Sequence, residues 1–249
     1  EKDNDLIELC SPFDFNDWIL DVRIEDNIVL VALAHNEVAI FDWTTRRILS
    51  VNKYTGTRCI LYCAHFISTS QHQFCIAAGT VFREIVIWSY SKDRFCNIQT
   101  LLGHDGIIFA LDYNKHLNIL ASASDDRSVR IWSDQSTKTS KSVDQCEMNF
   151  VLKYILYSHE ARIWKVVVMN KPYTIAISAG EDGAVCFWDI NNGSLIQKEK
   201  ACKNVRIWSL AVNDNSLYAF VGGSDSQVLS WNIEDVLQKF HSQKLFELD

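Results

Sequence analysis

The sequence lacks several features that would point to an enzyme or to a membrane protein. It has only two prolines and nine glycines among 249 residues. No apolar run reaches about 18 residues, the length that suggests a membrane-spanning helix. It also contains no P-loop, no glycine fingerprint for a dinucleotide and no His-Glu-x-x-His sequence. We therefore expect no membrane span, and no familiar catalytic motif identifies an active site.

Positive charge is also scarce. The chain has 24 lysines and arginines against 31 acidic residues, a net charge of −7 at pH 7. A protein that binds nucleic acid over a broad face usually carries a basic surplus, because each phosphate contact requires Lys or Arg. Any RNA contact must therefore be local or made by a partner. A hydrophobic fraction of 48% indicates a globular chain with a buried core.

The eight cysteines include no Cys-x-x-Cys pair, which favours a reducing compartment over a disulfide framework. The nearest approach to a metal cluster is Cys59, Cys63 and His65, whose two thiols are expected on one face of a strand. Zinc requires four converging ligands, so we interpret these as packed side chains and predict neither metal nor cofactor. The chain opens at Glu1 without a signal-peptide pattern. We expect a cytoplasmic piece of a longer protein.

An internal repeat organises the chain. Five extended runs each close on an aromatic residue, at spacings of 47, 44, 56 and 43 residues. A period of about 40–45 residues built from short strands is typical of a β-propeller blade. The long interval holds the polar stretch Ser133–Asn149, which we expect to be an inserted surface loop. The repeats end near Asp42, Ser89, Ser133, Asp189 and Asn232, and their closing aromatics are Phe41, Trp88, Trp132, Trp188 and Trp231.

Within each repeat the pattern is all-β. The third repeat predicts short strands at Ile107–Tyr113, Ile119–Ala123 and Val129–Trp132, separated by turn residues. No segment shows a sustained helical period. The chain thus resembles the WD-repeat family, and we predict a WD-repeat β-propeller over residues 1–249. About five four-stranded blades would be present of the seven that the family implies, with the remaining blades outside this chain.

That family builds a structural tetrad of His, Ser or Thr, Asp and Trp in each blade. The resemblance is complete in two repeats, whose tetrads are His104, Ser122, Asp126 and Trp132, and His159, Ser178, Asp182 and Trp188. Repeat five departs, with Lys203 and Val221 in the His and Ser positions beside Asp225 and Trp231. Repeat two has Thr57 and Phe82 in the His and Asp positions, and repeat one keeps only Phe41-Asp42. We expect these divergent blades to depend more on apolar packing.

The same residues invite a catalytic interpretation, since Ser, His and Asp can form a hydrolytic triad. However, the set recurs at matching spacing in neighbouring repeats, and two adjacent active sites are improbable. A repeated buried hydrogen-bond network explains both sets. We therefore expect no catalytic residue and no enzyme activity in this chain.

Aromatic residues lie five positions after the His position in every repeat. They are Trp18, Tyr62, Phe109, Trp164 and Trp208. The resemblance implies a place at the channel mouth, on the face most used by partners, although buried core packing explains the aromatics equally well. Arg162 and Arg206 precede two of them by two residues. Each guanidinium needs water, a carboxylate or a ligand, and Glu181 is the expected partner of Arg162. The candidate partner-binding residues are Trp18, Tyr62, Phe109, Arg162, Trp164, Glu181, Arg206 and Trp208.

Ordered sequence matches make the resemblance more specific. They are Asn16-Asp17-Trp18, Ala34-His35-Asn36, the stretches from Gly103 to Phe109 and from Ala123 to Trp132, His159 to Trp164, and Ser178 to Asp182. Over almost the whole chain they resemble the WD repeat-containing protein 6 family. This resemblance implies a non-catalytic partner of an FtsJ-like tRNA 2′-O-methyltransferase, directing ribose methylation at the wobble position. The methyl donor, S-adenosylmethionine, would lie on that enzyme.

The sequence leaves open a contact with tRNA and two alternative functions. The basic residues Arg162, Lys165, Lys203 and Arg206 leave room for a local tRNA contact. The main alternative function is a general protein-interaction propeller in signalling, trafficking or recruitment of substrates to a ubiquitin ligase. Hydrolase activity is a third interpretation that rests on the tetrad residues alone.

Overall fold

A computed structural model describes residues 15–56, 59–69, 73–92, 94–136, 148–201, 205–213 and 215–238. These residues form five antiparallel sheets, in each of which the strands pair in sequence order. Blade one contains β1 (Ile19–Glu25), β2 (Ile28–Leu33), β3 (Glu37–Asp42) and β4 (Arg47–Lys53). Blade two contains β5 (Leu61–Thr69), β6 (Gln73–Thr80), β7 (Ile85–Ser91) and β8 (Arg94–Leu101).

The remaining sheets continue the same order. Blade three contains β9 (Ile108–Asn114), β10 (Ile119–Ser124), β11 (Ser128–Asp134) and β12 (Phe150–Tyr157). Blade four contains β13 (Ile163–Met169), β14 (Ile175–Gly180), β15 (Ala184–Asp189) and β16 (Ser194–Lys200). Blade five contains β17 (Ile207–Asn213), β18 (Tyr218–Gly223) and β19 (Val228–Asn232).

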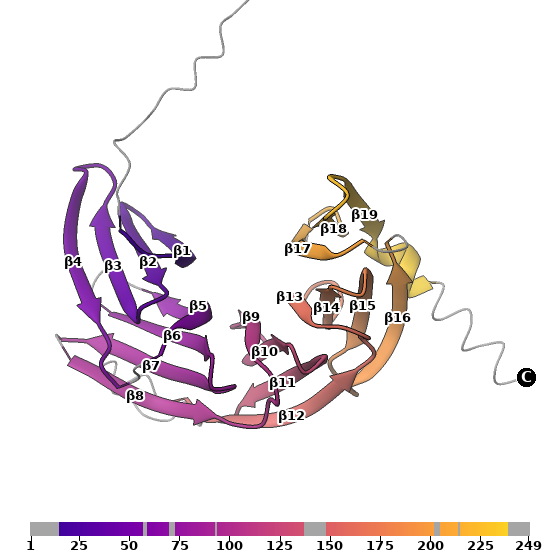
Figure 1. Ribbon diagram of the computed structural model, residues 1–249, viewed down its shortest axis with the longest axis horizontal. Helices are drawn as coiled ribbons and strands as arrows, with labels where there is room; N and C mark the ends of the chain where they lie inside the picture. Colours follow the sequence, from indigo (N-terminus) through magenta and orange to yellow (C-terminus); the bar gives the residue numbers. More distant parts are fainter. Residues whose placement is uncertain are drawn as a thin grey trace, which may run out of the picture.

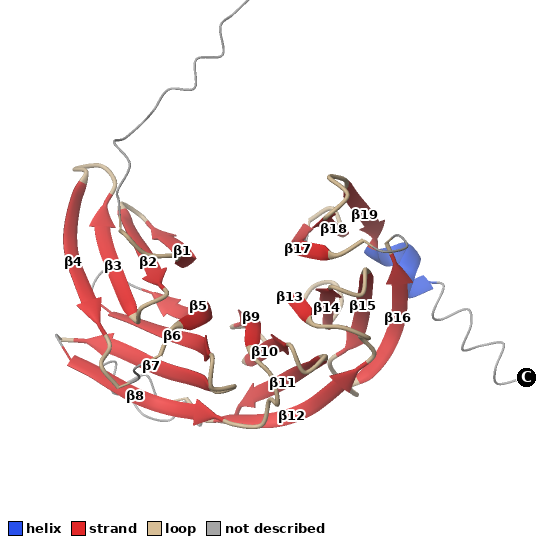
Figure 2. Cartoon of the chain, in the orientation of Figure 1, coloured by secondary structure: helices blue, strands red, loops and turns tan. Residues whose placement is uncertain are grey.

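The blades lie side by side in an open arc, with the first strand of each blade on the inside (Figure 1). Almost all the regular structure is strand, coloured red in Figure 2. The predicted all-β WD-propeller architecture is therefore confirmed. Four sheets have the expected four strands, whereas the described part of blade five has three. Within the described residues, no helix is long and apolar enough to cross a membrane.

A short helix at 233–238 follows β19, where the sequence pattern predicted no helix. The Asn232 side chain caps it, because its Oδ1 accepts the amide of Glu234 at 2.9 Å. Ile233, Val236 and Leu237 are buried against blades four and five. Six residues are too few to show a helical period, so this element could not be found from the sequence.

Apolar contacts between neighbouring blades form the core. The second strands β2, β10 and β14 are buried along their whole length. One apolar cluster joins blades one and two, and another joins blades two and three. Two more join blades three and four and blades four and five. The alternation of side chains along each strand therefore supplies both faces of a blade with apolar groups.

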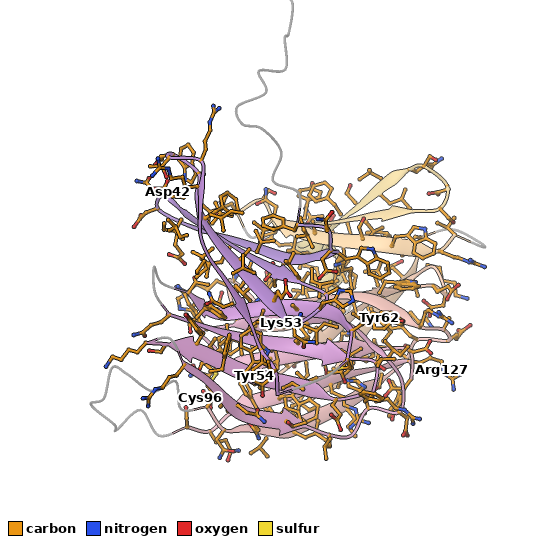
Figure 3. The ribbon with its side chains drawn as sticks, turned by 60° about the vertical axis from the view of Figure 1, so that its left-hand side comes forward. Asp42, Lys53, Tyr54, Tyr62, Cys96 and Arg127 are labelled. Atoms are coloured by element: carbon orange, nitrogen blue, oxygen red, sulfur yellow. The ribbon has the colours of Figure 1, made fainter. Side chains whose placement is uncertain are left out.

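A matching turn joins the second and third strands of every blade. In each turn one residue has a left-handed backbone, and these residues are Asn36, Arg83, Arg127, Gly183 and Ser226, with φ between 62° and 69°. These turns lie on one face of the arc. Figure 3 shows Arg127 and Tyr62 toward that face and Asp42 and Cys96 toward the opposite one. Of the stretch expected to form the inserted loop, Ser133 and Asp134 belong to β11, and residues 137–147 lie outside the described residues.

Candidate partner-binding site

The third blade joins its four tetrad side chains by hydrogen bonds. His104 Nδ1 lies 2.7 Å from Asp126 Oδ2, and its Nε2 lies 2.8 Å from Ser122 Oγ. Trp132 Nε1 donates to the same Ser122 Oγ over 2.9 Å. The Asp126 carboxylate can only accept, so the single proton of the neutral His104 ring lies on Nδ1, and Nε2 accepts the hydroxyl proton of Ser122. His104 Nδ1–H then donates to the Asp126 carboxylate, and every proton in the network has one acceptor.

The fourth blade repeats this arrangement. His159 Nδ1 lies 3.0 Å from Asp182 Oδ1, and its Nε2 lies 2.8 Å from Ser178 Oγ. Trp188 Nε1 donates to Ser178 Oγ over 2.8 Å. Ser178, like its counterpart in blade three, is completely buried. A hydroxyl that is buried and already shared between two rings cannot be reached by a substrate.

The protonation states agree with this network. Burial lowers the pKa of His104, so its ring is neutral. Burial alone would raise the pKa of Asp126, but hydrogen bonds from His104, Ser128 and the Asp105 amide hold it below its usual value. The pKa of Asp182 is lowered in the same way, with burial outweighed by His159. Blades three and four therefore each bury a carboxylate together with the groups that donate hydrogen bonds to it.

Blade two uses a different polar anchor. Phe82, in the Asp position, is 67% exposed. Thr80 Oγ1 accepts the amides of Phe82 and Glu84 at 3.2 and 3.3 Å and holds the turn instead. Trp88 is buried and stacks on Tyr54, with ring centroids 4.9 Å apart. Thr57 lies outside the described residues.

Blade five keeps part of the turn and an apolar interior. Asp225 Oδ1 accepts the amide of Gln227 at 3.2 Å, and Val221, in the Ser position, is buried. Lys203 lies outside the described residues. The expectation that divergent blades depend on apolar packing agrees with these contacts.

Blade one contains a His–Asp pair of a different kind, which the sequence comparison missed. Asp17, before β1, holds His35, in the turn between β2 and β3. The two side chains are 2.8 Å apart (Oδ1 to Nδ1), and the His35 amide donates to Asp17 Oδ2 over 2.8 Å. These hydrogen bonds lower the pKa of Asp17, although burial opposes them. His35 stands in the Asp position but Asp17 does not stand in the His position, so a comparison by column could not find the pair.

The strand-opening aromatics lie at a β-bulge in four blades. The register between the first and second strands skips one residue there. A bulged residue is left unpaired and the strand bends, which re-aims its side chain. The skipped residues are Tyr62, Phe109, Trp164 and Trp208.

Trp18 does not belong to this set. In blade one the skipped residue is Leu20. The Trp18 carbonyl accepts the amide of Ala34, which is the contact that Arg162 and Arg206 make with their own turns. The predicted alignment is therefore wrong by two residues in blade one, and Trp18 occupies the position of the arginines. It is 71% exposed and borders a surface hollow of about 440 Å³ beside His35.

The four bulged aromatics contact one another across the blades, and we call them the aromatic ladder. Their ring centroids are 6.0 Å apart between Tyr62 and Phe109, and 4.5 Å apart between Phe109 and Trp164. Trp164 and Trp208 follow at 5.2 Å. Tyr62 and Trp208, at the two ends, are 41% and 44% exposed. The ladder therefore joins blades two to five by one continuous aromatic surface.

Two arginines border the ladder, and carboxylates hold both. Arg162 Nε lies 2.9 Å from Glu181 Oε2, the predicted partner, and 3.2 Å from Asp125 Oδ1. Arg206 Nε lies 3.2 Å from Glu181 Oε1, a contact not foreseen from the sequence. The Arg162 guanidinium also lies 5.7 Å from the centroid of the Trp164 ring. We call these four charged residues the rim ion pairs.

The cysteine and histidine residues considered for a metal have other contacts. β5 begins at Leu61, so Cys59 lies before the strand and does not share a strand face with Cys63 as predicted. Cys63 Sγ donates to the Ile108 carbonyl over 3.3 Å, and burial raises its pKa to about 12. Both ring nitrogens of His65 lie 3.3 Å from Arg23 Nη2. No group of three potential metal ligands occurs in the described ranges.

Side-chain hydrogen bonds also tie certain inner strands together. Asp21 on β1 accepts the Phe66 amide of β5 over 3.0 Å. Asp112 on β9 accepts the Val168 amide of β13 over 2.7 Å. The two carboxylates therefore link blade one to blade two and blade three to blade four.

Comparison with known proteins agrees with this architecture. The family model described as "WD domain, G-beta repeat" matches residues 95–133 and 150–189. The solved C-terminal WD40 domain of Sif2 is similar over 88% of this chain and 56% of that one, with a TM-score of 0.62 at 19% identity. A chain of the mitotic checkpoint complex is similar over 89% of this chain and 65% of that one, with a TM-score of 0.66 at 19% identity.

The chain is also similar in sequence to several curated proteins. The human protein called "tRNA (34-2'-O)-methyltransferase regulator WDR6" is 30% identical over 231 residues, covering 89% of this chain and 19% of its own. The Drosophila melanogaster protein of the same name is 26% identical, covering 96% of this chain and 26% of its own. The chain thus spans about a fifth to a quarter of the length of these relatives. It is also 27% identical to Pre-mRNA-processing factor 19 homolog 2 of Arabidopsis thaliana, over 64% of this chain and 28% of that one.

Proposed function

We propose that this chain, which carries WD40 repeats, is a non-catalytic scaffold that partners an FtsJ-like tRNA 2′-O-methyltransferase and helps direct ribose methylation at the wobble position. The observation that carries the proposal is the similarity to tRNA (34-2'-O)-methyltransferase regulators over 89–96% of the chain. That span includes the two regular blades and the atypical ones. The free thiols described at five cysteines are in keeping with a cytoplasmic location.

The contacts of the tetrads support the non-catalytic part of the proposal. Ser122 and Ser178 are fully buried, and each hydroxyl is already shared between a histidine and a tryptophan. A triad nucleophile must instead face a substrate. The methyl transfer and the binding of S-adenosylmethionine are therefore assigned to the partner enzyme.

The aromatic ladder and the rim ion pairs supply the candidate docking surface. Aromatic and arginine side chains are the residue types most enriched in binding hot spots. Here they form one surface across four blades, with Trp18 exposed at the corresponding edge of blade one. We place the partner on this face of the arc.

The end faces of the arc support a larger propeller. On blade one, Val22 and Ile24 are directly opposite Val31 and Val29, on the face away from blade two, and both are exposed. On blade five, Val228 is 75% exposed on the face away from blade four. Exposed apolar faces of this kind are normally covered. We propose that further blades of the same protein pack against them.

Reconstitution with purified components tests the proposed function. The full-length protein, the methyltransferase of the same organism and a tRNA substrate are combined, and 2′-O-methylation at position 34 is measured by mass spectrometry. We expect the full-length protein to bind the enzyme and to increase methylation, and the protein alone to transfer no methyl group. Methylation that is unchanged by the protein, together with no complex on gel filtration, would reject the proposal.

A further inference from the structure

The charges beside the aromatic ladder are already paired. Arg162 and Arg206 are each held at 3.2 Å or less by the carboxylates of Glu181 and Asp125. The rim ion pairs therefore contain two positive and two negative charges and carry no net charge. A phosphate would have to displace a carboxylate to reach either guanidinium. These two guanidiniums are therefore not free to bind phosphate, the kind of contact that gives nucleic acid most of its affinity.

The ring geometry also leaves no room for a base between neighbouring rings of the ladder. Stacked bases lie about 3.4 Å apart, so a base inserted between two rings requires roughly 7 Å between their planes. Neighbouring rings of the ladder are 4.5 to 6.0 Å apart and tilted by 39° to 80°. The rings already touch one another, and no base can enter between them. Only their outward faces are available to a ligand.

Those outward faces favour a positively charged ligand. Tyr62 and Trp208 expose more than two fifths of their surface, and aromatic faces attract cations. Asp105 lies in the same rim, with its side chain 88% exposed and 3.9 Å from Arg83. Its amide is fixed by Asp126 over 3.0 Å, which holds it at the entry of blade three. The net charge of −7 also attracts a positively charged ligand at longer range.

We propose that the aromatic ladder binds an extended protein segment in which arginine or lysine alternates with apolar side chains. The apolar side chains lie on the exposed ring faces, and the cations reach the ring faces and the exposed carboxylate of Asp105. RNA contact is made elsewhere. This inference rests on the proposed scaffold function, because it names the kind of partner segment that the same surface takes.

Direct binding of defined probes to the full-length protein tests the inference. The first probe is a fluorescein-labelled peptide of alternating arginine and leucine. A glutamate–leucine peptide of equal length and an anticodon stem-loop RNA serve as comparisons, and anisotropy gives each Kd. We expect the basic peptide to bind at least about tenfold more tightly than the acidic one. Equal binding of the two peptides overturns the proposal.

Removal of the exposed rings separates the ladder from general charge attraction. The double variant Tyr62→Ala and Trp208→Ala should weaken binding of the basic peptide by about tenfold to thirtyfold, as loss of hot-spot residues does. The matched control Tyr157→Ala removes an aromatic that is 66% exposed on β12, outside the ladder, and should change nothing. Equal loss in both variants, or in neither, contradicts the inference.

The charge variant decides between protein and RNA by the sign of its effect. Asp125→Asn with Glu181→Gln frees the two guanidiniums and removes the carboxylates, and neither side chain is part of the buried tetrads. We expect weaker binding of the basic peptide, and stem-loop binding that is weak in the unaltered protein and rises in the variant. Strong stem-loop binding to the unaltered protein that depends on Trp208 would show the ladder to be an RNA site.

The experiments distinguish a failure of the proposed function from a failure of this inference. If the methyltransferase still binds all ladder variants with unchanged Kd, the scaffold function stands and the ladder is not its docking surface. If the enzyme does not bind the unaltered protein but the basic peptide does, the ladder chemistry stands and the partner is a different protein. Thermal melts of each variant confirm that the loss of binding is not a loss of fold.

Discussion

Single residues in this chain show how a buried polar network can be fully satisfied. In blade three the hydrogen bonds all run in one direction, with Trp132 donating to Ser122, Ser122 donating to His104 and His104 donating to Asp126. Removing any member leaves a buried donor or acceptor without a partner, which costs more than the bond itself contributes. The histidine is held neutral by its burial, so the network carries a single negative charge at its end.

Substitution of the tetrad aspartates should therefore reduce stability unequally. Asp126→Ala and Asp182→Ala should each lower the free energy of unfolding by about 1–3 kcal/mol, because buried donors lose their acceptor. Asp225→Ala should cost less, since Asp225 accepts only a turn amide in the described contacts. Chemical denaturation of the three variants measures the order. A larger loss at Asp225 would contradict the tetrad assignment.

His65 should make the stability depend on pH. Burial lowers its pKa to about 3, with Arg23 acting in the same direction. The unfolded chain therefore takes up a proton more readily, and the stability present above about pH 6.5 is lost as the pH falls toward 3, by roughly 1.4 kcal/mol per pH unit. Asp112, whose Oδ1 is 3.8 Å from Nε2, acts in the opposite direction, but the net direction of the shift in the His65 pKa is downward.

Urea denaturation between about pH 6.5 and 4.5 isolates this effect, since the usual pKa values of the carboxyl groups lie below that range. His65→Gln should flatten the pH dependence of the midpoint. Burial also lowers the pKa of His104, so part of the dependence should remain. A slope that is identical in the variant would show that His65 is accessible to protons in the folded state.

At the scale of strands, the sequence predicts the repeat but not the register. The closing runs and their aromatics identify the third strand of every blade, because short β-branched runs between turn residues are a local signal. The bulge at Tyr62, Phe109, Trp164 and Trp208 is a property of the pairing between two strands. Nothing in one strand reports it. The two-residue error in the alignment at Trp18 has the same cause, because the pairing of β1 with β2 cannot be read from the sequence.

The candidate site was predictable to a similar degree. The aromatics, the two arginines and the pairing of Arg162 with Glu181 followed from residue types and spacing. The sharing of Glu181 with Arg206 and the ring-to-ring contacts required the curvature of the arc, because they join different blades. The pair of Asp17 and His35 does not follow the column pattern and became visible only in three dimensions.

Strands of different blades should also differ in their protection from solvent. β14 is buried at every position, whereas β18 alternates between exposed and buried residues at the end of the described arc. Backbone hydrogen bonds near a free face open more easily. We expect the slowest amides of β14 to exchange at least about tenfold more slowly than those of β18. Hydrogen exchange followed by mass spectrometry measures this, and equal rates would argue for a fully cooperative arc.

The whole molecule has two apolar end faces, and these should govern its association. Ile24 is 69% exposed on blade one, and Val228 is 75% exposed on blade five. Patches of this kind promote association of the 249-residue chain with itself. Ile24→Lys with Val228→Lys should raise the monomer fraction in analytical ultracentrifugation. The control Ile155→Lys changes an exposed residue of β12, away from both ends, and should leave the distribution unaltered.

The seams between blades differ in their resistance to sliding. Asp21 and Asp112 lock the inner strands of blades one and two and of blades three and four by directional hydrogen bonds. No side chain of the described β13 bonds to the backbone of β17, so blade five meets blade four there through apolar contact and the Arg206–Glu181 ion pair. Apolar contact has no preferred direction. Cys63 and Gln99 likewise donate hydrogen bonds from blade two to backbone carbonyls of blade three. Among the described contacts, the seam where the rings of Trp164 and Trp208 meet is therefore the one with the fewest directional bonds. A ligand that contacts both rings would hold blade five at a fixed angle to blade four.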